Sequence, residues 1–385
     1  MKRVGCVILV LVLLAAVLPL SVGATQQPDL AVAGKSALLM DMATGKVLYA
    51  KNAHDRLAPA SVTKVMTMLL IMEAIDSGKI AMADAVTASE AAAAKGGSQV
   101  YLKVGETMTV ADMLKSIAVS SANDCACAMA EHIAGSEAAF VELMNQRAKE
   151  LGMNDTNYVN CTGLDDSENA KEHLTSAYDI ALVSRDLMLG HPDIQKFTTI
   201  WMDTVRNGEF GLSNTNKLVR FYQGATGLKT GFTSGAGYCL SATAQRDGLG
   251  LIAVVMGCDS SQNRFQACKS MLDYGFANFA LVTPQLSGPL SVPVTLGKAE
   301  AVEVIPAQQA PLLIDKAQKS TITTDISLEK EVAAPVSKGQ RLGTMTVRAG
   351  DQVLMQVPLL ARKAVRPLTF GDLFLLVLRK ICMGK

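Results

Sequence analysis

The chain has 385 residues, of which 49% are hydrophobic and 18% are charged, and its formal net charge is +1. This length and composition are those of a globular protein with room for two domains. A near-neutral chain without a glycine-rich phosphate-binding loop gives no case for nucleic acid as a partner, and no cofactor is expected.

The N-terminus predicts an export signal. Lys2 and Arg3 precede the apolar run Val7–Leu20, and the small residues Val22–Ala24 offer a cleavage site before Thr25. This order of charge, apolar run and small residues is typical of a secretory signal peptide over residues 1–24. The run is short for a membrane span, with an uncleaved anchor as the alternative. We therefore expect an exported protein.

The mature chain begins with a predicted hairpin. Two short apolar runs, Ala37–Met40 and Val47–Ala50, flank the turn sequence Ala43–Lys46. Such a pattern is typical of two antiparallel strands joined by a tight turn.

A candidate nucleophile follows the hairpin, in the sequence Ser61-Val62-Thr63-Lys64. The segment that follows has apolar residues at helical spacing and contains no Gly or Pro, so we expect a helix that begins near Pro59. Residues three apart on a helix share a face, which places the hydroxyl of Ser61 beside the amine of Lys64. A neutral lysine could then take the proton of the serine, and a nearby cation such as Lys229 would favour that neutral form. The alternative is a helix-start serine beside a solvated lysine.

A second polar motif, Ser121-Ala122-Asn123, stands where a loop meets a predicted buried helix. A hydroxyl there can relay a proton, and an amide can hold both the lysine and a substrate. The alternative is that Ser121 or Asn123 only caps the helix.

The third motif is Lys229-Thr230-Gly231, followed by two predicted strands that are joined by a turn at Asp247-Gly248. We expect the motif on an edge strand, where an extended substrate can add its own backbone. The lysine supplies charge, the threonine supplies a hydroxyl, and the glycine allows another backbone to approach closely. An ordinary turn tripeptide is the alternative. The other matches to the first two patterns, at Ser327, Ser167 and Ser261, lack the order and context of this set.

Strands from both ends of the region up to residue 283, with helices between them, predict an α+β domain. A last helix is expected at Phe265–Phe279. From residue 284 to residue 362, short Val, Thr and Leu runs separated by Pro and Gly predict a small all-β domain. We therefore divide the mature chain into a catalytic domain at 25–283, an all-β domain at 284–362 and a tail at 363–385.

The tail carries an apolar hexad, Leu373–Leu378, with Arg366 before it and Arg379 and Lys380 after it. The hexad is too short to span a bilayer but suits a helix that lies in the membrane interface. The alternative is a helix packed on the all-β domain.

No metal site is expected. The four histidines are scattered and lack the spacing of zinc ligands, and the eight cysteines form no disulfide framework.

Taken together, the three motifs resemble those of the low-molecular-mass penicillin-binding proteins of the serine D-alanyl-D-alanine carboxypeptidase family. The likeness includes Pro59–Thr67 around the first motif and Gly227–Thr233 around the third. It implies a transpeptidase-like catalytic fold, antiparallel sheet with flanking helices and a helical subdomain, and peptidoglycan stem peptides as substrates. It also implies β-lactam antibiotics as covalent inhibitors and contact of the tail with the membrane surface.

The resemblance also implies a role for each motif residue. Ser61 would be the acylated nucleophile and Lys64 its proton acceptor, with Ser121 and Asn123 completing the proton network. Lys229 and Thr230 would bind the terminal carboxylate of the substrate. Gly231 would also belong to the substrate-binding site, where it allows the substrate backbone to approach the strand. Arg264 resembles the second cation that contacts this carboxylate, with a surface arginine as the alternative. The oxyanion hole would use the backbone N–H groups of Ser61 and Phe232.

Two other functions stay open. A β-lactamase or esterase on the same scaffold is disfavoured by Ala122, where class A β-lactamases carry Asp, and by the lack of a clear E-x-x-L-N element. A non-catalytic cell-wall-binding protein is disfavoured by the presence of every motif residue. We therefore predict an exported serine D-alanyl-D-alanine carboxypeptidase, peripheral to the outer face of the cytoplasmic membrane.

Overall fold

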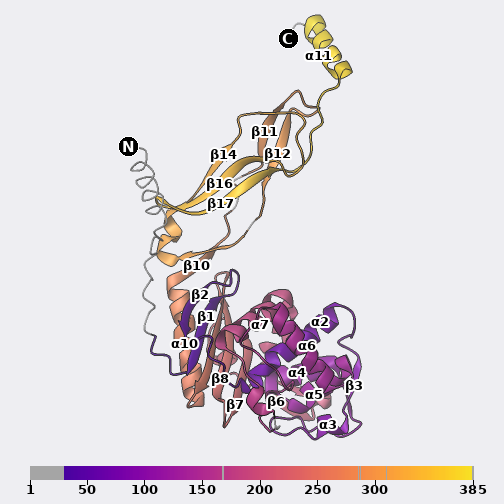
Figure 1. Cartoon of the computed structure of the whole chain (residues 1–385), viewed down its shortest axis with the longest axis vertical. Coiled ribbons are helices and arrows are strands. Elements are labelled where there is room, and N and C mark those ends of the chain that lie inside the picture. The colour runs from indigo at the N-terminus through magenta and orange to yellow at the C-terminus, as the bar shows by residue number, and fades with distance from the viewer. Residues whose placement is uncertain (1–29, 167–168, 285, 287, 309, 384–385) are drawn as a thin grey trace, which may run out of the picture. The chain divides into compact units, whose positions relative to one another are not determined.

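The computed structural model describes residues 30–166, 169–284, 286, 288–308, 310–383 (Figure 1). The predicted signal peptide at residues 1–24 lies outside these residues, as does Ser167 of one alternative motif.

An antiparallel sheet with the strand order β2-β1-β9-β8-β7 forms the frame of the N-terminal region. Chain segments from before and after the helices thus pair in one sheet, which confirms the predicted α+β class and the first hairpin. The third motif lies on β7 at the edge of this sheet, as expected. The strands are β1 (Ser36–Asp41), β2 (Val47–Lys51), β7 (Ala225–Thr233), β8 (Gly237–Arg246) and β9 (Leu249–Cys258).

Helices cover both faces of this sheet, with α10 on one face and α7 on the other (Figure 1). Because it is enclosed from both sides, β9 is apolar and buried along nearly all of its length, without the alternation of a half-exposed strand. The last helix begins at Ser261, four residues before the predicted start, because the side chain of Ser260 caps it by accepting a hydrogen bond from the amide of Asn263.

The remaining helices of this region form a subdomain beside the sheet. The region's α-helices are α2 (Lys64–Asp76), α3 (Glu90–Ala93), α4 (Val110–Ser120), α5 (Asn123–Ala134), α6 (Glu137–Glu150), α7 (Ala177–Gly190), α8 (Gln195–Thr198), α9 (Leu218–Phe221) and α10 (Ser261–Asn278). Single 3-10 turns are η1 (Ala60–Thr63), η2 (Ala170–Glu172), η3 (Pro192–Ile194) and η4 (Arg206–Gly208).

Two short strand pairs interrupt this helical region. Their three- or four-residue strands are too short to show a clear alternation of apolar and polar residues, so the sequence pattern did not indicate them. They are β3 (Ala85–Thr87) with β4 (Thr107–Thr109), and β5 (Met202–Val205) with β6 (Phe210–Ser213).

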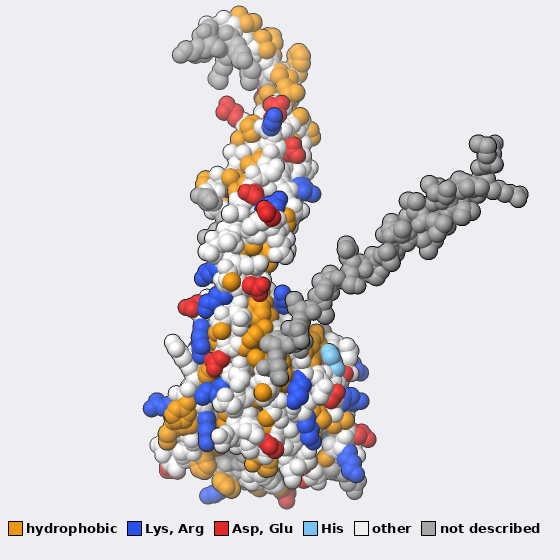
Figure 2. All heavy atoms as spheres, turned by 90° about the vertical axis from the view of Figure 1, so that its left-hand side faces the viewer, with side chains coloured by type: hydrophobic (Ala, Val, Ile, Leu, Met, Phe, Trp, Pro, Cys, Tyr) orange, Lys and Arg blue, Asp and Glu red, His pale blue; other side chains and the backbone are white. Residues whose placement is uncertain are grey.

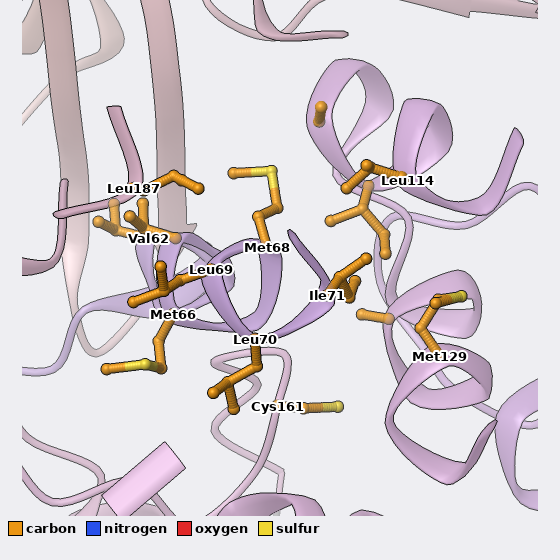
Figure 3. Close-up of a cluster of buried hydrophobic side chains, with 14 of the residues drawn as sticks. Val62, Met66, Met68, Leu69, Leu70, Ile71, Leu114, Met129, Cys161 and Leu187 are labelled. Carbon is orange, nitrogen blue, oxygen red and sulfur yellow. The ribbon is translucent and has the colours of Figure 1, made fainter. Parts of the chain in front are cut away.

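The helix α2 runs through the middle of the subdomain core and is apolar on all sides (Figure 3). Met66, Leu69 and Ile71 point in different directions from it, and each is fully buried. A helix that is apolar all round is stable only inside a core. Truncating one such side chain, as in Leu69→Ala, would cost about 2–5 kcal/mol. The helix that carries Lys64 is therefore held rigidly.

A six-stranded sheet with the order β14-β16-β17-β12-β11-β15 follows, which confirms the predicted all-β region. In β11 and β12 every second residue is buried, as expected for strands with one face on a core. The strands are β11 (Leu290–Thr295), β12 (Ala301–Pro306), β14 (Ile322–Leu328), β15 (Val332–Ala333), β16 (Arg341–Ala349) and β17 (Gln352–Ala361), and a separate ladder joins β10 (Phe279–Val282) to β13 (Leu312–Asp315), before η5 (Lys316–Thr321).

The last element that the structure describes is the helix α11 (Phe370–Met383), within the predicted tail. Between β17 and this helix, Val365 pairs with Val336 and is buried in the core of the β-region. Among the described residues, no helix combines the length and apolar character needed to cross a bilayer.

Candidate active site

Ser61 and Lys64 are in contact. Ser61 lies in the 3-10 turn η1, and Lys64 is the first residue of α2, which follows directly. The Nζ atom of Lys64 lies 2.9 Å from the Oγ atom of Ser61. The spacing of three residues therefore produces the predicted contact, and the alternative of a solvated lysine is wrong, because Lys64 is fully buried.

Burial determines the protonation of Lys64. It lowers the pKa of the ammonium to about 7, because a charged amine loses its hydration inside the protein. Cys161 and Asp124 act in the opposite direction and raise this pKa. Burial is therefore the main cause, and no neighbouring cation is needed to explain the lowered pKa of Lys64. The repulsion between Lys64 and Lys229 contributes to the lowered pKa of Lys229.

Ser121 and Asn123 occupy the junction between α4 and α5. Ser121 ends α4 in the left-handed conformation with φ of 65°, and Ala122 occupies the N-cap position of α5. Neither polar residue caps the helix through its side chain, so the capping alternative is wrong. Both side chains are almost completely buried, and they lie on elements that pack against α2.

The side-chain amide of Asn123 has a hydrogen-bond partner at its nitrogen and none among the described residues at its oxygen. Its Nδ2 donates to the carbonyl of Gly96 at 2.7 Å, while its Oδ1 is buried without a partner among the described residues. A buried amide oxygen without a donor is costly, which makes it a place where an incoming N–H group would be stabilised. The loop at Gly96 is held from the other side, because the carboxylate of Asp124 accepts from the amides of Val100 and Leu102.

The edge strand β7 presents the third motif with its polar groups buried. Lys229 is only 1% exposed, and its Nζ donates to the carbonyl of Thr230 at 2.9 Å. The hydroxyl of Thr230 donates to that of Thr215 at 2.7 Å. Burial, then Lys64, then Arg264 lower the pKa of Lys229 well below its usual range. A bound anion would raise this pKa again, because it would pair with the buried ammonium of Lys229.

Gly231 brings β7 directly against the turn that carries Ser61. A Cβ atom added to Gly231 would lie 2.7 Å from the carbonyl oxygen of Pro59 and 3.1 Å from the amide nitrogen of Ser61. Only glycine allows this approach of two backbones. Phe232 follows with its side chain 52% exposed and its ring stacked 4.3 Å from that of Tyr238, so its side chain points away from the buried part of the site.

Arg264 lies on α10, which packs against β8 and β9, and its side chain reaches the edge strand β7. Its side chain is buried, and its Nη1 donates to the carbonyl of Gly231 at 3.0 Å, while its Nε has no partner among the described residues. The surface-arginine alternative is wrong. The contact supports the strand and puts a positive charge near Lys229. Direct contact of Arg264 with a substrate stays a prediction.

Three further residues complete this constellation and were missed in the sequence. Thr162 offers its carbonyl to Lys64, Thr215 holds Thr230, and His173 contacts Thr63. The two partners of each contact are 15 to 110 residues apart in the sequence. Only Thr215 had a usable signal, since the asparagines on both sides of it indicate a tight polar turn.

This arrangement has the parts of a serine acyl-transferring enzyme: a serine in contact with a buried lysine, a buried polar junction on helices that pack against α2, and a cationic edge strand. Within the part of the chain that the structure describes, no group of three or more His, Cys, Asp or Glu side chains could hold a metal ion.

Comparison with known families agrees with this class. Residues 22–260 match the D-alanyl-D-alanine carboxypeptidase family of serine peptidases, and residues 287–367 match the C-terminal domain of penicillin-binding protein 5. The chain belongs to the D-alanyl-D-alanine carboxypeptidase family, and its fold is that of the penicillin-binding transpeptidases followed by an all-β domain.

Relatives and solved structures support this assignment along most of the chain. The D-alanyl-D-alanine carboxypeptidase DacF of Bacillus subtilis is 42% identical, over 89% of this chain and 88% of its own. The structure of penicillin-binding protein 5 from Haemophilus influenzae is 30% identical, with a TM-score of 0.75, and covers 89% of this chain and all of its own (100%). Penicillin-binding protein D2 from Listeria monocytogenes, in its ampicillin-bound form, is 31% identical, has a TM-score of 0.59 and covers 65% of this chain and 100% of its own.

Proposed function

We propose that this protein removes the terminal D-alanine from peptidoglycan stem pentapeptides through an acyl-enzyme on Ser61. The observation that carries the proposal is the 2.9 Å contact between the Ser61 hydroxyl and a lysine whose pKa burial lowers to about 7. At neutral pH a large fraction of Lys64 is then uncharged and able to accept the serine proton. Family membership supports the same activity.

In this mechanism Lys64 takes the proton from Ser61 as the serine oxygen bonds to the carbonyl carbon of the D-Ala–D-Ala bond. The backbone N–H groups of Ser61 and Phe232 stabilise the oxyanion. Ser121 and Lys64 pass the proton to the leaving amine, so that D-alanine departs and the peptide stays bound to Ser61 as an ester. Water then hydrolyses the ester, which releases the shortened peptide and restores the serine hydroxyl.

Recognition of the substrate would fall to the edge strand. Lys229 and the hydroxyl of Thr230 would bind the terminal carboxylate, and the unpartnered Oδ1 of Asn123 would accept an N–H group of the peptide or of Lys64. Gly231 would let the extended peptide lie beside β7. Arg264 would contribute its charge through the strand that it supports and would contact the carboxylate as the second cation.

Penicillin shares the amide and the carboxylate of this substrate, so we infer that β-lactams acylate Ser61 and leave slowly. The ampicillin-bound form of the Listeria relative supports this. Release of D-alanine from a diacyl-Lys-D-Ala-D-Ala peptide, with Ser61→Ala as the control, tests the activity. Labelling by fluorescent penicillin tests the nucleophile separately. A folded wild type that releases no D-alanine contradicts the carboxypeptidase, and rapid turnover of penicillin would favour a β-lactamase instead.

We also propose export by a signal at residues 1–24, a catalytic domain at 25–283, an all-β domain at 284–362 and a membrane-associating tail at 363–385. The exposed apolar residues of α11 support the tail as a membrane contact. Phe370, Phe374, Leu375 and Ile381 are 58–86% exposed, which is unusual for apolar side chains that have a protein partner. Orange apolar side chains are visible at the top of the molecule in Figure 2. Peripheral attachment at the outer face of the cytoplasmic membrane would place the site near newly made peptidoglycan.

A further inference from the structure

His173 is a buried histidine that none of the three motifs includes. It lies between η2 and α7, and only 3% of its surface is exposed. Its ring reaches Thr63, the last residue of the turn η1 that carries Ser61, directly before Lys64. We propose that His173 is a positioning residue, which fixes the backbone at Ala60 and Ser61 through the hydroxyl of Thr63. The inference rests on Ser61 being the nucleophile.

The hydrogen bonds around the ring define one tautomer. The amide of Val159 donates to Nδ1 at 3.0 Å, so Nδ1 carries no proton. In a neutral ring the proton is then on Nε2, which donates to the Oγ1 of Thr63 at 2.7 Å. Thr63 has one hydroxyl proton, and it goes to the carbonyl oxygen of Ala60 at 2.8 Å. Each donor and each acceptor in this chain of contacts has one role.

This series of hydrogen bonds ends at Ala60, whose backbone is strained. Ala60 has φ of 48°, in the left-handed region that costs an L-residue roughly 1–2 kcal/mol. Such a conformation persists only where its surroundings determine it, and strained residues cluster at functional sites. Ala60 directly precedes Ser61, so a relaxed φ at Ala60 would rotate the peptide that carries the Ser61 amide, one of the two proposed oxyanion donors.

Two glycines enclose the same turn but do not hold its carbonyl by a hydrogen bond. A Cβ added to Gly163 would lie 1.8 Å from the carbonyl oxygen of Ala60, and one added to Gly231 would lie 2.7 Å from that of Pro59. Close packing thus limits where the turn can move. The hydroxyl of Thr63 supplies the directional contact, and His173 orients that hydroxyl by occupying its acceptor side.

The surroundings of His173 keep it neutral. Burial, with a smaller effect from the positive charge of Lys64, lowers its pKa to about 4. Among the described residues, Tyr158 also faces the ring, at 5.7 Å between ring centroids, and burial raises its pKa. The neutral tautomer is therefore the form present throughout the pH range in which Lys64 would work.

Two substitutions of His173 distinguish the role of Nδ1 from the role of Nε2. The amide oxygen of Asn is placed like Nδ1, so His173→Asn keeps an acceptor for Val159 but is too short to reach Thr63. The longer Gln places an amide N–H near the position of Nε2, so His173→Gln can restore the bond to Thr63. Thr63→Val removes the hydroxyl while it preserves the shape of the side chain, and it tests the same link if a histidine variant fails to fold.

The experiment measures the second-order rate constant of labelling by fluorescent penicillin, the final labelled fraction, and kcat and KM for the D-Ala-D-Ala peptide. We expect His173→Asn and Thr63→Val each to slow acylation about 10- to 100-fold, because small displacements at a reacting centre have effects of this size. Labelling should still go to completion, with the loss in kcat rather than KM. His173→Gln should recover most of the rate. The double variant His173→Asn/Thr63→Val should be no slower than either single one, because both break the same link.

Tyr222→Phe is the control for a loss of stability alone. It removes the hydrogen bond at 2.7 Å from the hydroxyl of Tyr222 to the carboxylate of Asp273, which involves no residue of the three motifs, and should lower Tm without slowing acylation. A histidine variant that has a lowered Tm but acylates at the wild-type rate overturns the proposal, as do additive effects in the double variant. Failure of the wild type to be labelled at all would instead overturn the proposed nucleophile, and the inference with it.

Discussion

The Nζ atom of Lys64 lies 2.8 Å from the carbonyl oxygen of Thr162, a residue 98 positions further along the chain. The same nitrogen lies 2.9 Å from the Ser61 hydroxyl. The carbonyl accepts one N–H of the amine. This contact orients the other positions around Nζ toward the serine. A neutral Lys64 in this position presents its lone pair to the proton that it must accept.

Acylation should therefore depend on pH through Lys64. Because only the neutral amine is a base, the rate should rise with pH and level off above an apparent pKa of about 7. The measurement is the rate of labelling by fluorescent penicillin between about pH 5 and pH 9, with circular dichroism at each pH as the control for folding. A rate that is constant across this range would contradict the assignment of Lys64 as the base.

Substitution of the two buried lysines should separate chemistry from recognition. Lys64→Ala removes the base, so acylation by both peptide and penicillin should collapse, at a cost of several kcal/mol, roughly a thousandfold or more in rate. Lys229→Ala should mainly damage binding of the carboxylate that peptide and penicillin share, which raises KM. Steady-state kinetics on the peptide distinguish these effects. Equal and negligible changes in both variants would refute the site.

The same buried amine should lower the stability of the fold. An unfolded Lys64 has an ordinary pKa near ~10.4, whereas the folded value is about 7. The unfolded chain then binds one more proton between these two values, so the destabilisation is fully present below pH 7 and disappears as the pH rises toward 10.4. Lys64→Met should be more stable than wild type at pH 7, by up to roughly 4 kcal/mol, and the difference should shrink at pH 10.

Urea unfolding of both proteins at the two pH values measures this difference. The comparison is between variants at each pH, so that other groups which titrate in this range cancel. A Lys64→Met protein that is less stable than wild type at pH 7 would mean that the contacts to Ser61 and Thr162 outweigh the cost of burying the amine.

Gly231→Ala should be among the most damaging small substitutions in the chain. The added Cβ would lie 2.7 Å from the carbonyl of Pro59 and 3.0 Å from the amide of Val62, both of them backbone atoms that cannot rotate away. Either β7 or the Ser61 turn must shift, and a displacement of this size should reduce acylation by about 100-fold. Gly235→Ala on the loop after β7 is the matched control, since its nearest neighbour would be a carboxylate oxygen of Asp165 at 3.4 Å. Labelling rates of the two variants at equal folded concentration test the contrast.

The sequence indicates those parts of this site that depend on local spacing. The contact of Ser61 with Lys64 follows from a separation of three residues on a helix, and the position of Lys229 on an edge strand follows from the strands around it. Long-range partners could not be found in this way. The carbonyl of Thr162 acts through the backbone, so the residue type carries no signal for its role.

Two further features depended on burial, which one-dimensional patterns estimate poorly. A neighbouring cation was expected to help lower the pKa of Lys64, but enclosure by the core is the main cause. Arg264 looked equally suited to the surface and to the substrate, and only the packing of α10 against β8 and β9 shows that it is buried. The fold class and the all-β region, in contrast, followed from apolar periodicity and turn residues.

The last prediction concerns α11. A truncation after Leu368 removes this helix but keeps the pairing of Val365 with Val336 and the bond from the amide of Leu368 to the carbonyl of Leu296, so the β-region should stay folded. A truncation after Arg362, at the boundary predicted from the sequence, would instead remove the buried Val365. Turnover of a small soluble peptide should be unchanged, because the three motifs all precede residue 232.

Membrane association should be lost, since burial of an apolar helix face is the main source of interfacial affinity. The measurement is pelleting with anionic vesicles for the full-length and truncated proteins, both without residues 1–24. A full-length Phe374→Ser/Leu375→Ser variant is the matched control, because it keeps every charge of the tail while replacing two side chains that are 58% and 62% exposed. It should bind vesicles about tenfold or more weakly, given about 25 cal/mol for each Å² of apolar surface removed from water. A truncated protein that still pellets would show that the anchor lies elsewhere in the chain, and an unaffected double variant would leave the charges of the tail as the source of binding.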